Sequence, residues 1–199
     1  MSATPSDYTN LAVFVSGRGS NFESIIDSCD HGELKTLARV TLVVASKANI
    51  HALQIAESAG IDRYIYSRDI PVANLLSALE EYKIGFIALA GYLRRVEPEV
   101  LKKFAGRIVN IHPALLPKFG GKGMYGLRVH QAVIESGETI SGVTVHYVSE
   151  EYDAGQILAQ ETVAVEENDT AETLADKILE IEHKVYPEAI AVAIRNLER

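Results

Sequence analysis

Short apolar runs alternate with helical stripes of apolar residues over the first half of the chain. Residues 11–15 form an almost continuous apolar run, which is typical of a strand buried on both faces of a parallel sheet. After a glycine-rich turn, Phe22, Ile25, Ile26 and Cys29 recur at the spacing of one helix face. A strand that leads through a tight turn into a helix predicts the first unit of a β-α repeat.

The same alternation continues as far as residue 111. The predicted elements are a strand at 40–45, a helix at 49–59, a strand at 64–66, a helix at 72–82, a strand at 86–90, a helix at 98–104 and a strand at 107–111. Because each predicted helix connects two strands, the strands are expected to run parallel. We therefore predict an α/β fold with a Rossmann-like N-terminal half, in which helices cover both faces of an open, mostly parallel, twisted sheet.

The pattern changes after Pro113. A glycine-rich loop at 119–126 and a helix near 129–136 are followed by residues 143–147, where apolar and polar positions alternate as in a strand. Residues 157–165 have the pattern of its return strand. The C-terminal part is therefore predicted to contain a β-hairpin.

A long helix is predicted to close the chain. It opens at Asp169, and Glu172 stands three residues on, where a capping box places its acidic residue. Its predicted buried stripe, before Pro187, consists of Leu174, Ile178, Ile181 and Val185. Because the sequence has no repeat, low-complexity segment or linker, residues 1–199 are predicted to form a single domain.

Composition limits the kind of partner that the protein can have. A formal net charge of −8 argues against broad binding of nucleic acid or of an acidic membrane surface. The single cysteine, Cys29, excludes an internal disulfide and favours a reducing compartment. Residues 1–10 are polar, without the apolar core of a signal peptide, and no apolar run approaches a membrane span of about 20 residues. A cytoplasmic protein that acts on small molecules is the expectation.

Asn110 and His112 are the first candidates for chemistry. They lie two positions apart at the end of a predicted strand, so their side chains point to the same face, and Pro113 ends the strand after them. An amide donor beside an imidazole suits a reaction that builds negative charge on a carbonyl oxygen while a nearby nitrogen loses a proton. Acyl transfer to an amine is such a reaction. The alternative is an ordinary pair of satisfied polar side chains.

The glycine-rich turn at residues 17–21 is a candidate phosphate site. Its glycines allow close backbone approach to an anion, Arg18 adds charge, and the following helix offers free N–H groups at its N-terminus. Ser20 and Glu23 also fit a capping box, so a purely structural turn is an equal alternative. The turn is neither a Walker A loop nor a complete G-x-G-x-x-G motif, which disfavours dinucleotide binding.

Other ionisable residues are ambiguous from their pattern alone. Asp153 lies in an acidic, turn-like segment, and it has a function only if it stands beside His112, where a carboxylate favours the protonated imidazole. Glu182 is beside the predicted stripe of the last helix, where a glutamate is usually solvated. Structural roles are expected for His130, His146 and His183. No spacing of His, Cys and carboxylates predicts a metal site.

Several of these segments together resemble one enzyme family. The landmarks, in order, are residues 17–21 (GRGSN), 90–94 (AGYLR), 110–117 (NIHPALLP), 153–155 (DAG), and 182–183 (EH) before 186–187 (YP). From residue 11 onward the chain resembles the phosphoribosylglycinamide formyltransferases, within the folate-dependent formyltransferases. The resemblance implies transfer of a formyl group from the co-substrate 10-formyltetrahydrofolate to the amine of glycinamide ribonucleotide, in purine biosynthesis and without a metal.

The resemblance also implies roles for single residues. The catalytic residues would be Asn110, which bonds the formyl oxygen, His112, which stabilises the tetrahedral intermediate and passes a proton to the folate nitrogen, and Asp153, which keeps His112 protonated. The ribonucleotide would be held by Gly17, Arg18, Gly19, Ser20, Asn21 and Glu182. The folate would be held by Arg68, Leu93, Arg94, Arg95, Val96 and Asn110, with the backbone of residues 93–96 along the pterin. The enzyme is expected to be a monomer or a homodimer.

Two departures from the family pattern and several alternatives stay open. The loop at residues 119–128 is longer and richer in glycine than the family's usual link, and Arg95 stands where an apolar residue is expected. Formylation of initiator tRNA is disfavoured because the basic domain of that family is missing. Hydrolysis of the formyl-folate is disfavoured because no N-terminal regulatory domain is expected. A sugar-nucleotide acceptor is disfavoured by the phosphate loop. A non-catalytic folate- or nucleotide-binding module is the alternative from another class.

Overall fold

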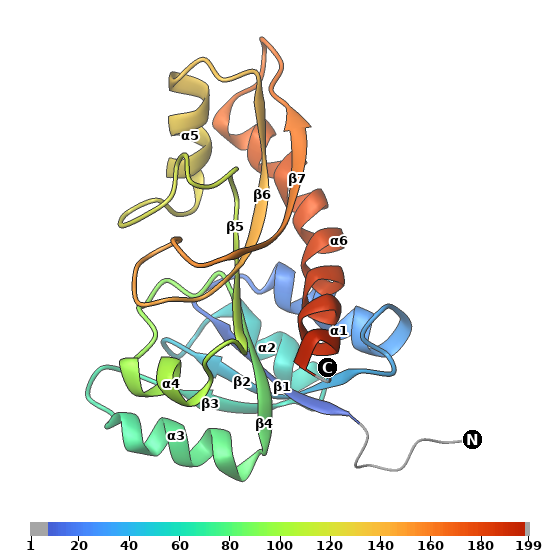
Figure 1. Cartoon of the computed structure of the whole chain (residues 1–199), viewed down its shortest axis with the longest axis vertical. Coiled ribbons are helices and arrows are strands. Elements are labelled where there is room, and N and C mark those ends of the chain that lie inside the picture. The colour runs from blue at the N-terminus through green and yellow to red at the C-terminus, as the bar shows by residue number, and fades with distance from the viewer. Residues whose placement is uncertain (1–7, 198–199) are drawn as a thin grey trace.

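A computed structural model describes residues 8–197 of the chain (Figure 1). One seven-stranded sheet has the strand order β3-β2-β1-β4-β5-β6-β7. The pairs among β1 to β5 are parallel, whereas β5 pairs with β6, and β6 with β7, in antiparallel fashion. The predicted α/β fold with an open, mostly parallel sheet and a C-terminal hairpin is therefore confirmed. The sequence predicts no signal peptide in residues 1–10, and residues 1–7 of that segment lie outside the described residues.

The elements follow the predicted alternation closely. The strands are β1 (Thr9–Val15), β2 (Ala38–Ala45), β3 (Asp62–Ile65), β4 (Ile84–Ala90), β5 (Ile108–His112), β6 (Ile140–Tyr147) and β7 (Ile157–Ala164). The helices are α1 (Ser20–His31), α2 (His51–Ser58), α3 (Val72–Glu81), α4 (Pro98–Lys103), α5 (Leu127–Glu135) and α6 (Ala171–Leu197). No helix within residues 8–197 is both long enough and apolar enough to cross a membrane.

Two apolar cores lie on opposite faces of the sheet, because successive side chains of a strand point to opposite sides. In β1, Leu11, Val13 and Val15 belong to the core beneath α1, α2, α5 and α6. Ala12 and Phe14 belong to the core beneath α3 and α4. This double burial explains why the central strands β1 and β4 have almost uninterrupted apolar sequences, whereas the edge strand β3 is mostly exposed.

Helix α6 extends well past the position at which its predicted stripe ends. It runs through Pro187, which is buried within the helix, and continues to Leu197. The hydroxyl of Tyr186 is fully buried and donates to the carbonyl oxygens of Leu89 (2.9 Å) and Val109 (3.2 Å). Apolar packing and this anchor on β4 and β5 offset the backbone hydrogen bond that proline cannot make.

The start of α6 also differs from the prediction. Thr170, not Asp169, caps the helix, because its Oγ1 accepts from the N–H of Thr173 at 3.3 Å. Asp169 instead accepts from the ammonium of Lys177 at 2.8 Å and from the backbone N–H of Glu166, also at 2.8 Å. The predicted capping box of Asp169 and Glu172 is therefore wrong by one residue.

The arrangement of the strands places the candidate residues in the middle of the molecule. Strands β1, β4 and β5 are parallel neighbours, so the segments that follow them meet at one edge of the sheet. In Figure 1, β1 to β4 and α1 to α4 form the lower part, while α5, the hairpin β6–β7 and the start of α6 rise above it. The segments that follow β1, β4 and β5 therefore meet where these two parts join.

Candidate active site

A cavity of about 920 Å³ lies at this junction. It is lined by most of the candidate residues, namely Arg18, Ser20, Asn21, Leu93, Arg94, Arg95, Val96, Asn110, His112, Asp153 and Glu182. Gly17 and Gly19 belong to the same turn but do not line the cavity. Gly19 has φ +89°, and a Cβ there would lie 2.8 Å from Cβ of Ala52 on α2, so this position requires glycine for packing.

Asn110 and His112 lie on β5 and both face the cavity, as their spacing predicts. The amide Nδ2 of Asn110 is 3.2 Å from Nε2 of His146. His112 is almost fully buried, and its Nε2–H donates to the carbonyl oxygen of Phe119 at 2.8 Å. Because a carbonyl oxygen can only accept, the proton of His112 is fixed on Nε2, and Nδ1 is left facing Asp153.

Asp153 stands beside His112, so the condition for its functional interpretation is met. One carboxylate oxygen, Oδ2, is 3.6 Å from Nδ1 of His112, and the other, Oδ1, is 3.5 Å from Nε2 of His146. Oδ2 also accepts from the backbone N–H of Gly121 at 2.8 Å. Asp153 has φ +54°, a left-handed conformation that aspartate tolerates better than most residues and that aims the carboxylate between the two imidazoles.

The pKa of His112 is set by opposing effects. Burial lowers it below the ordinary value, and the nearby Asp153 carboxylate and the Phe119 carbonyl only partly oppose this effect. Burial and the Asp153 carboxylate thus act in opposite directions on the pKa of His112, and the expectation that Asp153 keeps His112 protonated stays a prediction. Burial alone would raise the pKa of Asp153, but His146, His112 and the Gly121 N–H together hold that pKa below its ordinary value.

His146 and His130 are site residues that the sequence pattern missed. His146 lies opposite Asn110 in the β5–β6 register, and its Nδ1–H donates to the carbonyl of Tyr147 at 2.9 Å. When His146 is neutral, its Nε2 therefore accepts from the Asn110 amide. His130 of α5 lines the cavity, and its buried Nδ1 has no hydrogen-bond partner among the described residues. Only the strand register could have revealed His146 from sequence.

The phosphate-site candidate has an uncapped helix end. Helix α1 begins at Ser20, and no side chain caps its first turn, so the alternative capping box of Ser20 and Glu23 does not form. Free N–H groups and the positive end of the helix dipole therefore face the region of Arg18, Ser20 and Asn21. Such a helix end can receive an anion.

Glu182 is buried rather than solvated, with only 8% of its surface exposed. Its Oε2 accepts from Nδ2 of Asn21 at 2.8 Å, which joins α6 to the phosphate-site turn. Burial raises the pKa of Glu182 to about 7, against the smaller lowering effect of the Asn21 amide. A carboxylate that is kept at such a cost in the wall of a cavity is a candidate for ligand binding.

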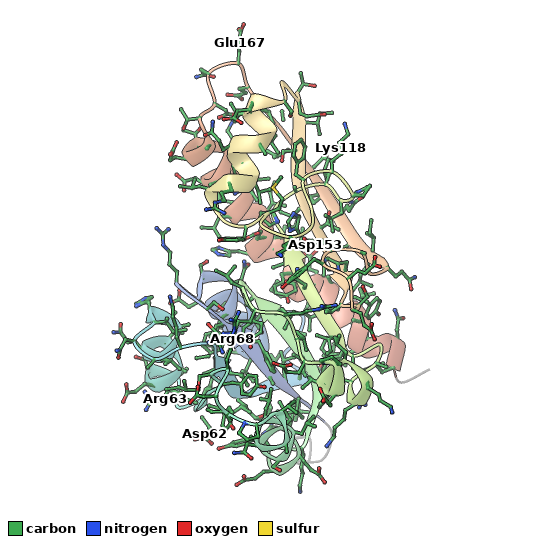
Figure 2. The ribbon with its side chains drawn as sticks, turned by 90° about the vertical axis from the view of Figure 1, so that its left-hand side faces the viewer. Asp62, Arg63, Arg68, Lys118, Asp153 and Glu167 are labelled. Atoms are coloured by element: carbon green, nitrogen blue, oxygen red, sulfur yellow. The ribbon has the colours of Figure 1, made fainter. Side chains whose placement is uncertain are left out.

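The candidate folate residues divide between two cavities. Residues 93–96 line the main cavity, whereas Arg68 lines an adjoining cavity of about 350 Å³, which shares Arg94 and Arg95 with the first. Arg94 is tied to the carbonyl of Tyr66 (2.6 Å), and Arg95 to that of Glu150. Figure 2 shows Arg68 in the lower part of the molecule, well separated from Asp153.

The loop at residues 119–128 is held against the candidate catalytic residues. Phe119, at φ +56°, contributes the carbonyl that binds His112, and Gly121 contributes the N–H that binds Asp153. Further along the loop, the ring of Tyr125 lies under Arg128 of α5, at 5.3 Å. The start of the loop therefore orients the site, in addition to forming part of the cavity wall. Within residues 8–197, no cluster of three or more His, Cys, Asp or Glu could hold a metal ion.

The geometry of the site points to a class of protein. An amide donor, an imidazole and a carboxylate converge in one cavity between an uncapped helix end and residues 93–96, an arrangement that suits acyl transfer between two bound substrates. The family model described as formyl transferase matches residues 9–190. The chain belongs to the formyl transferase family.

Individual relatives are more specific. The chloroplastic phosphoribosylglycinamide formyltransferase of Arabidopsis thaliana is 46% identical over 187 residues, which cover 90% of this chain and 63% of that protein. A glycinamide ribonucleotide transformylase 1 structure from Symbiobacterium toebii has a TM-score of 0.87 and 35% identity, covering 96% of this chain and 90% of that one. The phosphoribosylglycinamide formyltransferase structure from Brucella melitensis has a TM-score of 0.84 and 38% identity, covering 94% and 96%.

The predicted resemblance to the phosphoribosylglycinamide formyltransferases is thereby confirmed. The chain nevertheless spans less than two thirds of the length of the plant relatives, 63% for Arabidopsis thaliana and 59% for Vigna unguiculata.

Proposed function

We propose that the protein transfers the formyl group of 10-formyltetrahydrofolate to the amine of glycinamide ribonucleotide, in purine biosynthesis. The observation that carries the proposal is the convergence of Asn110, His112 and Asp153 in a cavity between the uncapped start of α1 and residues 93–96. The names of the relatives support the choice of acceptor. The single cysteine supports a reducing, cytoplasmic compartment, and the net charge of −8 supports small-molecule substrates. We propose one domain, monomeric or homodimeric.

The ribonucleotide is proposed to lie between α1 and α6. Arg18, Ser20 and Asn21 would hold its phosphate at the helix end, where free N–H groups and a positive charge are combined. Glu182 would bind polar groups of the ribose and glycinamide, because Asn21 is the one hydrogen-bonded neighbour of its buried carboxylate within residues 8–197. The folate would lie along residues 93–96, on the other side of Asn110 and His112.

Transfer requires one bond to form and one to break. The amine nitrogen of the ribonucleotide attacks the formyl carbon, the bond from that carbon to the folate nitrogen breaks, and a proton moves from the amine to the folate nitrogen. Asn110 has two amide protons, so one can bind His146 while the other points to the formyl oxygen, where negative charge develops.

His112 and Asp153 are proposed to move the proton. Because Nε2–H of His112 is committed to the Phe119 carbonyl, the exchangeable proton belongs to Nδ1, on the side of Asp153. Asp153 stabilises the imidazolium while it exists and receives the proton that the amine loses. The lowered pKa of His112 suits this role, because a weakly basic imidazole releases its proton readily to the departing nitrogen.

The variant His112→Ala tests the assignment. It is expected to abolish transfer while ribonucleotide affinity, measured by calorimetry, stays close to that of the wild type. His51→Ala is the matched control, because His51 is exposed and contacts only Gln54 among the hydrogen-bonded side chains described. Near-normal turnover in His112→Ala would exclude the proposed role of His112.

A further inference from the structure

A pair of buried serines joins the two predicted substrate segments. Ser16 directly precedes the phosphate-site turn, and only 6% of its surface is exposed. Its Oγ accepts from the hydroxyl of Ser46 at 2.8 Å and from the backbone N–H of Leu93 at 2.9 Å. Leu93 is the first residue of the segment that is proposed to run along the folate. One hydroxyl therefore connects the end of β1 to the segment that follows β4.

The other anchors of the segment around Leu93 are a turn and side-chain contacts, including those of Arg94 and Arg95 with the carbonyls of Tyr66 and Glu150. After β4 the chain turns at Gly91, with φ +67°, and Tyr92 packs edge-on against Phe14 at 5.3 Å. Leu93 itself is 56% exposed and lines the cavity, so its side chain contributes little to fixing the backbone. The Ser16 hydroxyl thus supplies the inward hydrogen bond at the point where the chain enters the site.

We propose that Ser16 is a positioning residue for folate binding, which holds the backbone of residues 93–96 at a fixed place relative to the phosphate-site turn. This inference rests on the proposed function, because it takes the folate to lie along these residues. It has a direct corollary: the Leu93 N–H is committed to Ser16, so backbone N–H groups of this segment that donate to the folate belong to residues 94–96. Ser46 fixes the orientation of the Ser16 hydroxyl.

The variant Ser16→Ala removes the acceptor and leaves the Leu93 N–H unpaired. Restoring a partner to that N–H requires the segment to move, so we expect the KM for the folate to rise about tenfold. The KM for the ribonucleotide and kcat at saturating folate are expected to stay within about twofold of wild type, because neither the phosphate-site residues nor Asn110 and His112 are altered.

Ser28→Ala is a closely matched control. Ser28 is also buried, and its Oγ also accepts a backbone N–H, that of Leu34 at 3.3 Å, but it lies on α1 and does not line the cavity. The control is expected to lower thermal stability without changing either KM. A tenfold rise of the folate KM in Ser16→Ala alone supports the proposal. An unchanged folate KM, or an equal rise of both KM values, overturns it.

Two further measurements keep the proposal testable if Ser16→Ala does not fold or if the wild type shows no turnover. The first follows amide hydrogen exchange in the wild type, where the Leu93 amide is expected to be protected more strongly than that of Arg95; equal, rapid exchange overturns the proposal. The second measures binding of tetrahydrofolate to wild type and Ser46→Ala by calorimetry. A fall in affinity that is smaller than the tenfold effect expected for Ser16→Ala supports the role of Ser46, whereas an affinity equal to that of the wild type excludes it. Wild-type turnover itself tests the proposed function separately.

Discussion

Replacing Glu182 by glutamine should make the protein more stable and less active. The side chain is 8% exposed, and its pKa is raised by burial to about 7. Glutamine keeps the size of the side chain and an oxygen that can accept from Asn21, but it cannot ionise. The substitution therefore removes the cost of a buried negative charge with little change in packing.

The size of the effect follows from the two pKa values. Relative to its ordinary 4.5, the pKa of Glu182 is raised to about 7, a difference of about 2.5 pH units. Between these values the folded protein keeps a proton that the unfolded chain has lost, so wild-type stability falls as pH rises through this window. At about 1.4 kcal/mol for each pH unit, the full loss is about 3 kcal/mol by pH 8 and less than about 1 kcal/mol at pH 5.

Urea denaturation at pH 5 and at pH 8 measures this difference. Glu182→Gln is expected to exceed the wild type in free energy of unfolding by about 3 kcal/mol at pH 8 and by much less at pH 5. Glu180→Gln, an exposed position on the same helix, controls for the loss of one negative charge. The KM for the ribonucleotide should rise about tenfold in Glu182→Gln, because a hydrogen bond to a charged group is lost.

Equal differences in the free energy of unfolding at pH 5 and pH 8 would contradict a raised pKa of Glu182. If Glu182→Gln and the wild type differ by the same amount at both pH values, Glu182 does not titrate between about 4.5 and 7 in the folded protein. If stability rises as predicted but the ribonucleotide KM is unchanged, the burial is real and the binding role is wrong. A gain in stability with a loss of affinity is the usual signature of a residue kept for function.

Three other substitutions probe the site and its frame. Asn110→Ala should lower kcat by about 10²–10³, measured in steady-state assays, because an oxyanion donor is removed; a loss below tenfold would contradict this role. Asp153→Asn should lower kcat by about 10²–10⁴ and move the alkaline limb of the kcat/KM profile to lower pH, since Asp153 raises the pKa of His112; an unmoved limb would exclude the coupling. Gly142→Ala should destabilise the β6–β7 hairpin and lower Tm, because a Cβ would lie 2.0 Å from the carbonyl oxygen of Glu161; an unchanged Tm would contradict the packing.

Local pattern was sufficient to predict the elements of the N-terminal half. The central parallel strands β1 and β4 are buried on both faces and each helix on one, so the two periodicities are distinct in the sequence. The end of α6 was harder to predict from the sequence. Pro187 suggested the end of a helix, but the Tyr186 anchor on β4 and β5 and the apolar packing around it carry the helix onward. Tertiary contacts of this kind leave no local signal.

The catalytic candidates were predictable to different degrees. Asn110 and His112 share a strand face, so two-residue spacing was enough to place them together. Asp153 reaches them across a loop, and His146 does so through the antiparallel register, which depends on how β6 pairs with β5. Resemblance to a family supplied Asp153, whereas His146 emerged only from the three-dimensional structure.

The protonation of His112 depends on burial, which the sequence pattern alone does not give. A carboxylate beside an imidazole suggests a charged histidine, and the contact is present between Asp153 and His112. The direction of the pKa shift depends on how deeply the pair is buried, and here burial has the larger effect and lowers the pKa of His112. Glu182 illustrates the same principle with the opposite sign, because burial raises the pKa of a carboxyl group.

The central proposal is tested most directly by mixing the protein with 10-formyltetrahydrofolate, with and without glycinamide ribonucleotide, and following the release of tetrahydrofolate. The proposed function predicts that tetrahydrofolate is released only when the ribonucleotide is present. The amount released should equal the amount of formylated ribonucleotide that forms. Release without any amine would contradict it and indicate a hydrolase. No release in either mixture, with the folate still bound, would contradict formyl transfer to this acceptor and favour another acceptor or a binding module.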